Sequence, residues 1–117
     1  MPGLISDLFR GDPRLEKCLV SDPHHVTPNT IGPFVGKLQF ALLVLEGGSI
    51  SGSEIMSTRY GPDTAALVLA YKRKRKIINF TYQTKPDNIV GKMTIKSLDA
   101  ELFAFESRER LAQRVRT

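Results

Sequence analysis

The same helix start occurs twice in this chain, and it restricts the folds that the chain can adopt. The stretches YGPDTAALV, from Tyr60, and VGKMTIKSL, from Val90, lie 30 residues apart. Each has an apolar residue, Gly, two variable positions, Thr, three variable positions and a second apolar residue. Glycine permits a sharp turn, and a Thr hydroxyl in the first helical turn can satisfy a backbone N–H. A partial copy at Ile31 adds a third start, so we expect a compact bundle of three core helices.

Apolar residues recur at helical spacing after each start, and this pattern predicts the core. The first predicted helix follows Gly32 and ends at the pair Gly47–Gly48, because glycine is typical of a helix C-terminus. The second follows Gly61, with Pro62 in its first turn, and the third follows Gly91. The predicted inward positions are Val35, Leu38, Leu42, Leu45, Leu67, Val68, Tyr71, Ile95, Leu98 and Leu102.

The segments on either side of the three helices are predicted to be arms. The predicted domain occupies residues 32–102, with an N-terminal arm of short helical turns at 1–31 and a C-terminal helical extension at 103–117. In the first arm, Asp12 suits a helix N-cap and Pro13 suits the position after it. The apolar residues of the extension either pack on the domain or face a partner; they are Phe105, Leu111 and Val115.

Two connections separate the predicted core helices. The stretch SISGSEIMSTR reads as a loop of small residues from which Ile50, Ile55 and Met56 reach the core. The β-branched and aromatic residues near 77–84 predict a short extended segment.

Length and composition narrow the class of protein. With 117 residues the chain has room for one domain, and no apolar run approaches the ~20 residues that a membrane span needs. A single cysteine, Cys18, excludes an internal disulfide. The N-terminus lacks the features of a cleavable secretory signal, so we expect synthesis in the cytoplasm.

Taken in order, these motifs resemble the peptidoglycan-binding-like domain family. That family's pattern is G-x-x-V-x-x-L-Q-x-x-L, then F-G-x-x-T-x-x-A-V-x-x-F-Q, then V-G-x-x-T-x-x-x-L. The matching residues, all within 32–102, are Gly32, Val35, Leu38, Gln39, Leu42, Gly61, Thr64, Val68, Tyr71, Val90, Gly91, Thr94 and Leu98. The resemblance implies a small, mainly α, three-helix module that has no catalytic activity and binds the bacterial cell wall.

Three departures from the family's pattern flank the surface where a ligand is expected. The family's Phe-Gln is Tyr71-Lys72 here, the loop between the first two helices is longer, and the loop before Val90 is expanded. We expect ligand contacts, through hydrogen bonds and charge pairing, in the loops that lead into the second and third helices. These candidates are Arg59, Tyr60, Gln83, Asp87, Asn88 and Lys92. Turn formation and helix capping are the alternative interpretation of all six.

Five consecutive cations, KRKRK, account for the whole net charge of +5. Successive helical residues point about 100° apart, so these cations are predicted to ring the exposed end of the second helix. They are Lys72, Arg73, Lys74, Arg75 and Lys76. Such a patch would attract anionic wall polymers, less strongly as salt increases. Direct nucleic-acid binding through the same run is a further hypothesis.

No pattern of catalytic residues stands out, so we expect no enzyme activity and no cofactor. Cys18, Asp22, His24 and His25 carry groups that bind metals. Their spacing matches no zinc pattern, and a solvated loop is the simpler interpretation. We therefore predict no metal site.

The leading hypothesis is a non-catalytic module that binds peptidoglycan or its stem peptides and anchors a partner protein at the wall. The alternative is an adaptor module, with the same fold, in a secreted effector system. The alternative is kept because the wall lies outside the cytoplasm and no signal is visible. Leaderless export or lysis would bring the chain to the periplasm or the wall.

Overall fold

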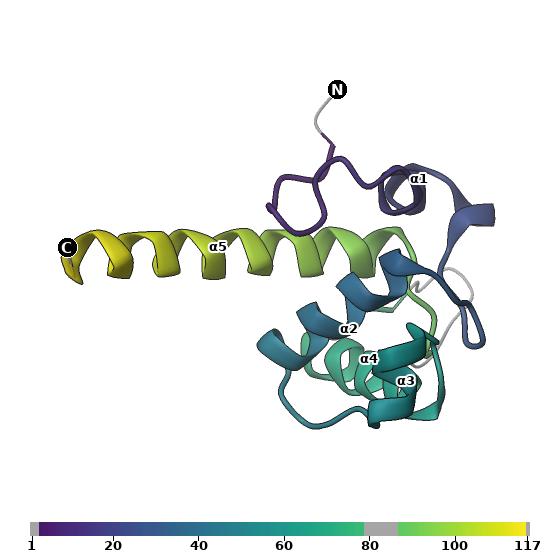
Figure 1. Ribbon diagram of the computed structural model, residues 1–117. Helices are drawn as coiled ribbons and strands as arrows, with labels where there is room; N and C mark the ends of the chain where they lie inside the picture. Colours follow the sequence, from purple (N-terminus) through teal and green to yellow (C-terminus); the bar gives the residue numbers. More distant parts are fainter. Residues whose placement is uncertain (1–2, 79–86, 117) are drawn as a thin grey trace.

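The computed structural model describes residues 3–78 and 87–116. This part of the chain contains five α-helices and one short 3-10 helix. No strand occurs among these residues, and the prediction of a mainly α bundle is confirmed (Figure 1). The elements are α1 (Pro13–Val20), the 3-10 helix (Asp22–His24), α2 (Pro33–Leu45), α3 (Gly52–Ser57), α4 (Pro62–Arg75) and α5 (Lys92–Arg116). The extended segment predicted near 77–84 lies mostly outside the described residues.

The three predicted core helices are α2, α4 and the first part of α5. Of the ten predicted inward positions, all but Leu45 are buried, and Leu45 is partly buried against the same core. Proline in the first turn of α2 and of α4 fits the backbone there without losing a hydrogen bond. Helix α4 ends at Arg75 because Lys76 takes the left-handed conformation that closes many helices.

The N-terminal arm belongs to the same core. As predicted, the Asp12 carboxylate caps α1 by accepting from the N–H groups of Arg14 and Leu15, and Pro13 follows it. Leu4, Phe9 and further apolar side chains of residues 3–31 are buried against those of α2, α4 and α5. Burying large apolar side chains is the main source of stability in such a small chain. The arm is therefore a structural part of the bundle.

Two carboxylates of α5 hold the arm in place. Asp99 accepts from the backbone N–H groups of Ile5 (2.9 Å) and Ser6 (2.8 Å). Two helical turns further on, Glu106 accepts from those of Asp7 (2.7 Å) and Leu8 (3.1 Å). Residues seven apart lie on one side of a helix, so the two carboxylates face the arm together.

The connection between α2 and α4 differs from the expected loop. It contains α3, whose buried residue is the acid Glu54. Ile50 packs against the core as predicted, but Ile55 and Met56 do not: Met56 is 89% exposed. The prediction was wrong for these two because the helix turns its polar Glu54 inward, toward N–H groups at the start of α4 that have no partner within that helix.

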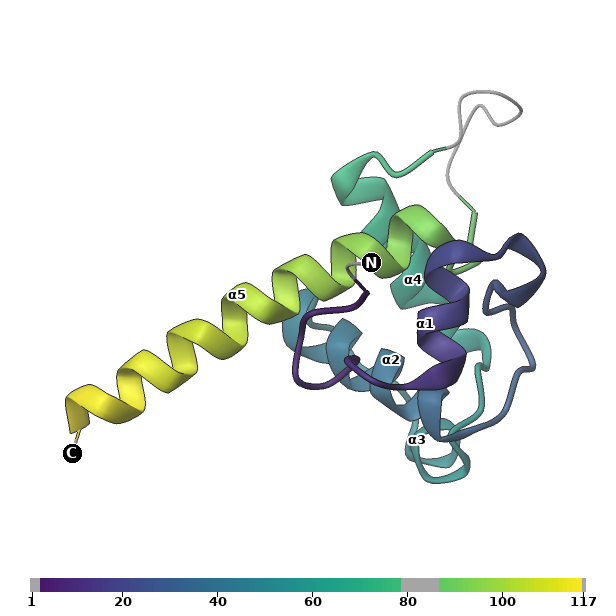
Figure 2. The same ribbon diagram turned by 90° about the horizontal axis from the view of Figure 1, so that it is seen from above.

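Helix α5 is a single unbroken helix of 25 residues. Its first part lies over the bundle, and its second part extends beyond the other elements and ends away from them (Figures 1 and 2). The C-terminal extension predicted from residue 103 is thus continuous with the third core helix.

Candidate functional site

The starts of α2, α4 and α5 are joined to one another by backbone hydrogen bonds. Val26 and Val90 exchange two such bonds of 2.9 Å. Tyr60 donates to the Thr30 carbonyl (2.9 Å) and accepts from the Asn29 N–H (2.7 Å). We call residues 25–31, 58–61 and 87–92 the helix-start surface. It brings together segments that are far apart in the sequence.

A buried carboxylate organises the start of α4. Glu54 accepts from the N–H groups of Gly61 (3.1 Å), Asp63 (2.9 Å) and Thr64 (3.0 Å), and from the Thr64 hydroxyl (2.8 Å). The first N–H groups of a helix have no partner within it, so Glu54 supplies what the helix lacks. Thr64 was expected to cap this turn with its own hydroxyl, but the charged carboxylate is the stronger acceptor.

Gln39 joins α2 to this cluster. Its Nε2 donates to the Thr64 hydroxyl (3.1 Å) and to the Arg59 carbonyl (3.0 Å). Two of the residues that carry the family resemblance, Gln39 and Thr64, are therefore joined directly. They act here in the interior of the bundle, where both are buried.

The environment of Glu54 keeps its carboxylate charged and limits the size of the residue at position 61. Burial tends to raise its pKa, but the hydrogen bonds from Asp63, Thr64 and Gly61 together hold the pKa below the usual value. A Cβ atom on Gly61 would lie 2.6 Å from the Glu54 carboxyl carbon. Glycine is required at position 61 because the carboxylate approaches the backbone so closely.

Tyr60 lies beneath the helix-start surface and is fully buried. Its hydroxyl donates to the backbone carbonyl of Asn88 and so links the starts of α4 and α5. Burial, followed by the nearby charge of Asp87, raises its pKa. This placement differs from the predicted ligand contact, because both the ring and the hydroxyl are used inside the protein.

The structure brings most of the other predicted contact residues to the helix-start surface. Arg59, Asp87 and Asn88 are half-buried, and Lys92 is exposed in the first turn of α5. The Asp87 carboxylate is paired with Lys72, at 2.6 Å. The sixth candidate, Gln83, lies outside the described residues.

The run of five cations does not form a uniform exposed ring. Lys72 is buried, and its Nζ donates to Asp87 and to the Ile89 carbonyl (2.8 Å). Arg73, Lys74 and Lys76 are exposed, whereas Arg75 turns inward. Two of the five charges are therefore turned into the fold, and three remain on the surface, where Lys74 also pairs with Glu46 (3.4 Å).

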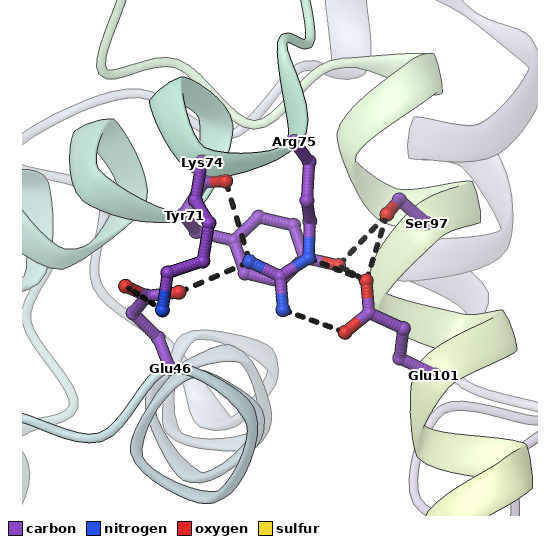
Figure 3. A network of polar contacts seen from close by, with 6 residues as sticks. All are labelled: Glu46, Tyr71, Lys74, Arg75, Ser97 and Glu101. Atoms are coloured by element: carbon purple, nitrogen blue, oxygen red, sulfur yellow. Dashed lines mark hydrogen bonds and ion pairs between the residues drawn. The ribbon is translucent and has the colours of Figure 1, made fainter.

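Arg75 is the centre of a network that joins three helices (Figure 3). Its guanidinium stacks on the Tyr71 ring, 3.7 Å from the centroid, and makes two bonds to Glu101 of α5. It also contacts Glu46, at the end of α2 (3.0 Å). The hydrogen bonds from Arg75 hold the pKa of Glu101 below its usual value. Such a planar, bidentate and stacked arrangement is specific to arginine.

A shallow groove of about 380 Å³ lies beside this network. It runs between the end of α2 and the middle of α5. Apolar side chains and two charged ones line it; they are Val44, Leu45, Glu101, Ala104, Phe105 and Arg108. Its lining therefore offers charged as well as apolar contacts.

Cys18, which lies in α1, and His24 of the 3-10 helix make contacts within the fold. Cys18 is buried, its Sγ contacts the Val90 carbonyl (3.4 Å), and burial raises its pKa to about 11. The His24 ring is bonded to the Ser21 hydroxyl (2.8 Å). Within residues 3–78 and 87–116, no three His, Cys, Asp or Glu side chains are grouped closely enough to bind a metal.

Sequence patterns did not reveal the carboxylates that organise this structure. No distinctive sequence motif marks Glu54, Asp99 or Glu106. The only available signal was the seven-residue spacing of the last two, which places them on one side of a helix.

Comparisons with protein-family models, with curated proteins and with solved structures found no match for this chain. None of the helices in the described part of the chain is long and apolar enough to cross a membrane.

Proposed function

We propose that this protein is a non-catalytic module that binds peptidoglycan through the helix-start surface. The supporting observation is that three chain segments are fixed to one another there by backbone hydrogen bonds. A surface held in one conformation loses little conformational entropy when a ligand binds. The resemblance of the helix starts to the peptidoglycan-binding-like pattern supports the same ligand.

The chemistry of the surface suits the peptide part of peptidoglycan. Arg59 and Lys92 are cations that can pair with the free carboxylates of stem peptides, and Asn88 offers an amide for backbone hydrogen bonds. The chain has no tryptophan for stacking on sugar rings. We therefore assign the stem peptide, rather than the glycan strand, as the part that is recognised.

Binding to purified insoluble peptidoglycan, at low and at high salt, tests this proposal. We expect the protein to stay with the pellet at high salt and to be lost when Arg59 and Lys92 are both changed to alanine. Both side chains reach solvent, so the double variant should keep its circular dichroism spectrum. A wild-type protein that remains in the supernatant would contradict the proposal.

A second variant separates site binding from general charge attraction. Changing Arg73, Lys74 and Lys76 to glutamine removes only the exposed cations of the run. Lys72 and Arg75 are kept, because their loss would disturb the fold. We expect this variant to bind at high salt like the wild type. Retention that moderate salt abolishes, and that depends only on these three cations, would leave no role for the helix-start surface.

A further inference from the structure

The helix-start surface contains a short antiparallel ribbon, formed by residues 30–32 and 58–60, in which Ile31 lies opposite Arg59. Backbone hydrogen bonds of 2.9 and 3.2 Å join the two segments on either side of this pair. In an antiparallel ladder, residues that lie opposite each other between such bonds direct their own N–H and C=O groups away from the partner segment. Ile31 and Arg59 therefore direct these groups to the two outer edges of the ribbon.

The two outer edges of the ribbon differ. On one edge, the Arg59 N–H donates to the Glu54 carbonyl (3.0 Å), and the Arg59 C=O accepts from Gln39 Nε2 (3.0 Å). On the other edge, neither backbone group of Ile31 has a partner within residues 3–78 and 87–116, and its side chain is 64% exposed. An unpaired edge of this kind can accept a further extended segment. The bundle closes the Arg59 edge and leaves the Ile31 edge open.

The open edge is short, and its length limits what can pair with it. Alternate residues of an extended segment share an edge, so the neighbouring positions are 29 and 33. The Asn29 N–H is already bonded to the Tyr60 carbonyl (2.7 Å), and Pro33 has no N–H. A long strand of a folded protein would find no continuing ladder there. A short extended peptide needs only the one N–H and one C=O of Ile31, and a glycan strand lacks the matching peptide groups.

The side chain of Arg59 adds a charge to this edge. Residues directly opposite each other in an antiparallel pair project their side chains from the same face, so Arg59 lies beside Ile31. The Arg59 guanidinium is half-buried and makes no hydrogen bond or ion pair with the described residues. Adjacent strands are about 4.8 Å apart, so an added peptide would lie about 10 Å from the Arg59 backbone. An extended arginine and a carboxylate-bearing side chain together span that separation.

We propose that a stem peptide binds as an added strand at the open edge, where one of its residues exchanges backbone hydrogen bonds with Ile31 and one of its carboxylates pairs with Arg59. This inference rests on the proposed function. It adds the extended conformation in which the peptide is held and the backbone groups that hold it.

Hydrogen exchange in the wild-type protein tests the backbone pairing. The probe is the set of disaccharide peptides that a muramidase releases from peptidoglycan, added to ¹⁵N-labelled protein and followed by NMR. We expect exchange of the Ile31 amide with water to slow by about three- to tenfold at saturation, because one hydrogen bond forms. The Ser49 amide is the matched control: it also has no partner among the described residues but lies outside the helix-start surface, so its rate should not change.

A pair of variants tests the same hydrogen bond through affinity. Ile31→Pro removes the N–H, and proline is tolerated at an edge whose N–H faces solvent. Ile31→Ala keeps the N–H and is the matched control. We expect Ile31→Pro to weaken binding to insoluble peptidoglycan by about three- to tenfold, and Ile31→Ala by no more than about twofold. Circular dichroism checks that both variants are folded, and if Ile31→Pro is not, the exchange rates of the wild type decide.

The outcomes separate this inference from the proposed function. A wild-type protein that does not sediment with peptidoglycan contradicts the proposed function itself. A wild-type protein that sediments, but whose Ile31 amide exchanges equally fast with and without the disaccharide peptides, overturns the added strand alone. Equal affinities of folded Ile31→Pro and Ile31→Ala would overturn it as well.

Discussion

Glu54 is the residue on which the start of α4 depends. Its carboxylate accepts three backbone N–H groups and one hydroxyl, and almost none of it is exposed. A carboxylate buried with this many donors is stable as an anion and would be costly without them. Gly61 leaves the space that this arrangement needs.

We expect Gly61→Ala to destabilise the protein by about 1–3 kcal/mol, because the new methyl group would displace the Glu54 carboxylate from its donors. Gly52→Ala, at the start of α3, is the matched control. Nothing lies within 4 Å of a Cβ at position 52, so this change should be neutral or slightly stabilising. Urea unfolding measures both, and equal effects at the two positions would contradict this account.

Stability should fall in acid as Glu54 is protonated. The folded pKa of Glu54 is depressed below its ordinary value of 4.5, so its contribution is complete above that value and is lost as pH falls through the folded pKa. Glu101, held by Arg75, acts in the same direction. Unfolding free energies measured from neutral pH downward should decline below about pH 4.5, and Glu54→Gln should flatten the decline. An unchanged slope in that variant would exclude Glu54 as a cause.

Helix α5 makes three kinds of contact on three of its faces. Ile95, Leu98 and Leu102 enter the core, Asp99 and Glu106 hold the arm, and Leu111 and Val115 face outward. Each face follows from helical spacing along one continuous element.

Asp99→Asn should loosen the arm and lower the free energy of unfolding by about 1.5–3 kcal/mol, since an amide offers only one oxygen to the two N–H groups that Asp99 now accepts. Hydrogen exchange should accelerate at the amides of Ile5 and Ser6. Glu109→Gln, an exposed change on the same helix, should affect neither quantity. Unchanged protection at both amides would show that Asp99 does not hold the arm.

The sequence predicted the elements better than the contacts between them. Helical spacing located α2, α4 and α5, because their buried apolar side chains recur over several turns. Helix α3 was missed because it has six residues and buries an acid, so it leaves no apolar pattern. Lys72 was predicted to be exposed, since a sequence gives no sign that Asp87 and a carbonyl of a distant loop would meet it.

The N-terminal arm and the helix bundle share one core. Phe9, near the beginning of the chain, is fully buried with side chains from α2, α4 and α5. Such shared burial makes separate unfolding of the arm unfavourable. The boundary predicted at residue 31 therefore marks a change in sequence pattern within a continuous interior.

We expect Phe9→Ala to cost about 3–5 kcal/mol, the usual cost of removing a buried aromatic ring, and to lower a single unfolding transition. Phe40→Ala removes the same ring from a site that is 56% exposed and should cost far less. Thermal unfolding followed by circular dichroism compares the two. Two separate transitions, or a small effect at position 9, would mean that the arm is an independent unit.

The position of Glu54 also limits how this protein can be redesigned. Connections between helices are usually the safest places to shorten a chain, and the one between α2 and α4 is long and largely exposed. Removing α3 from this connection would delete the acceptor for the first amides of α4, although every buried apolar side chain would remain. A minimised version of this bundle would need a replacement acid within reach of Gly61 before its linker could be trimmed.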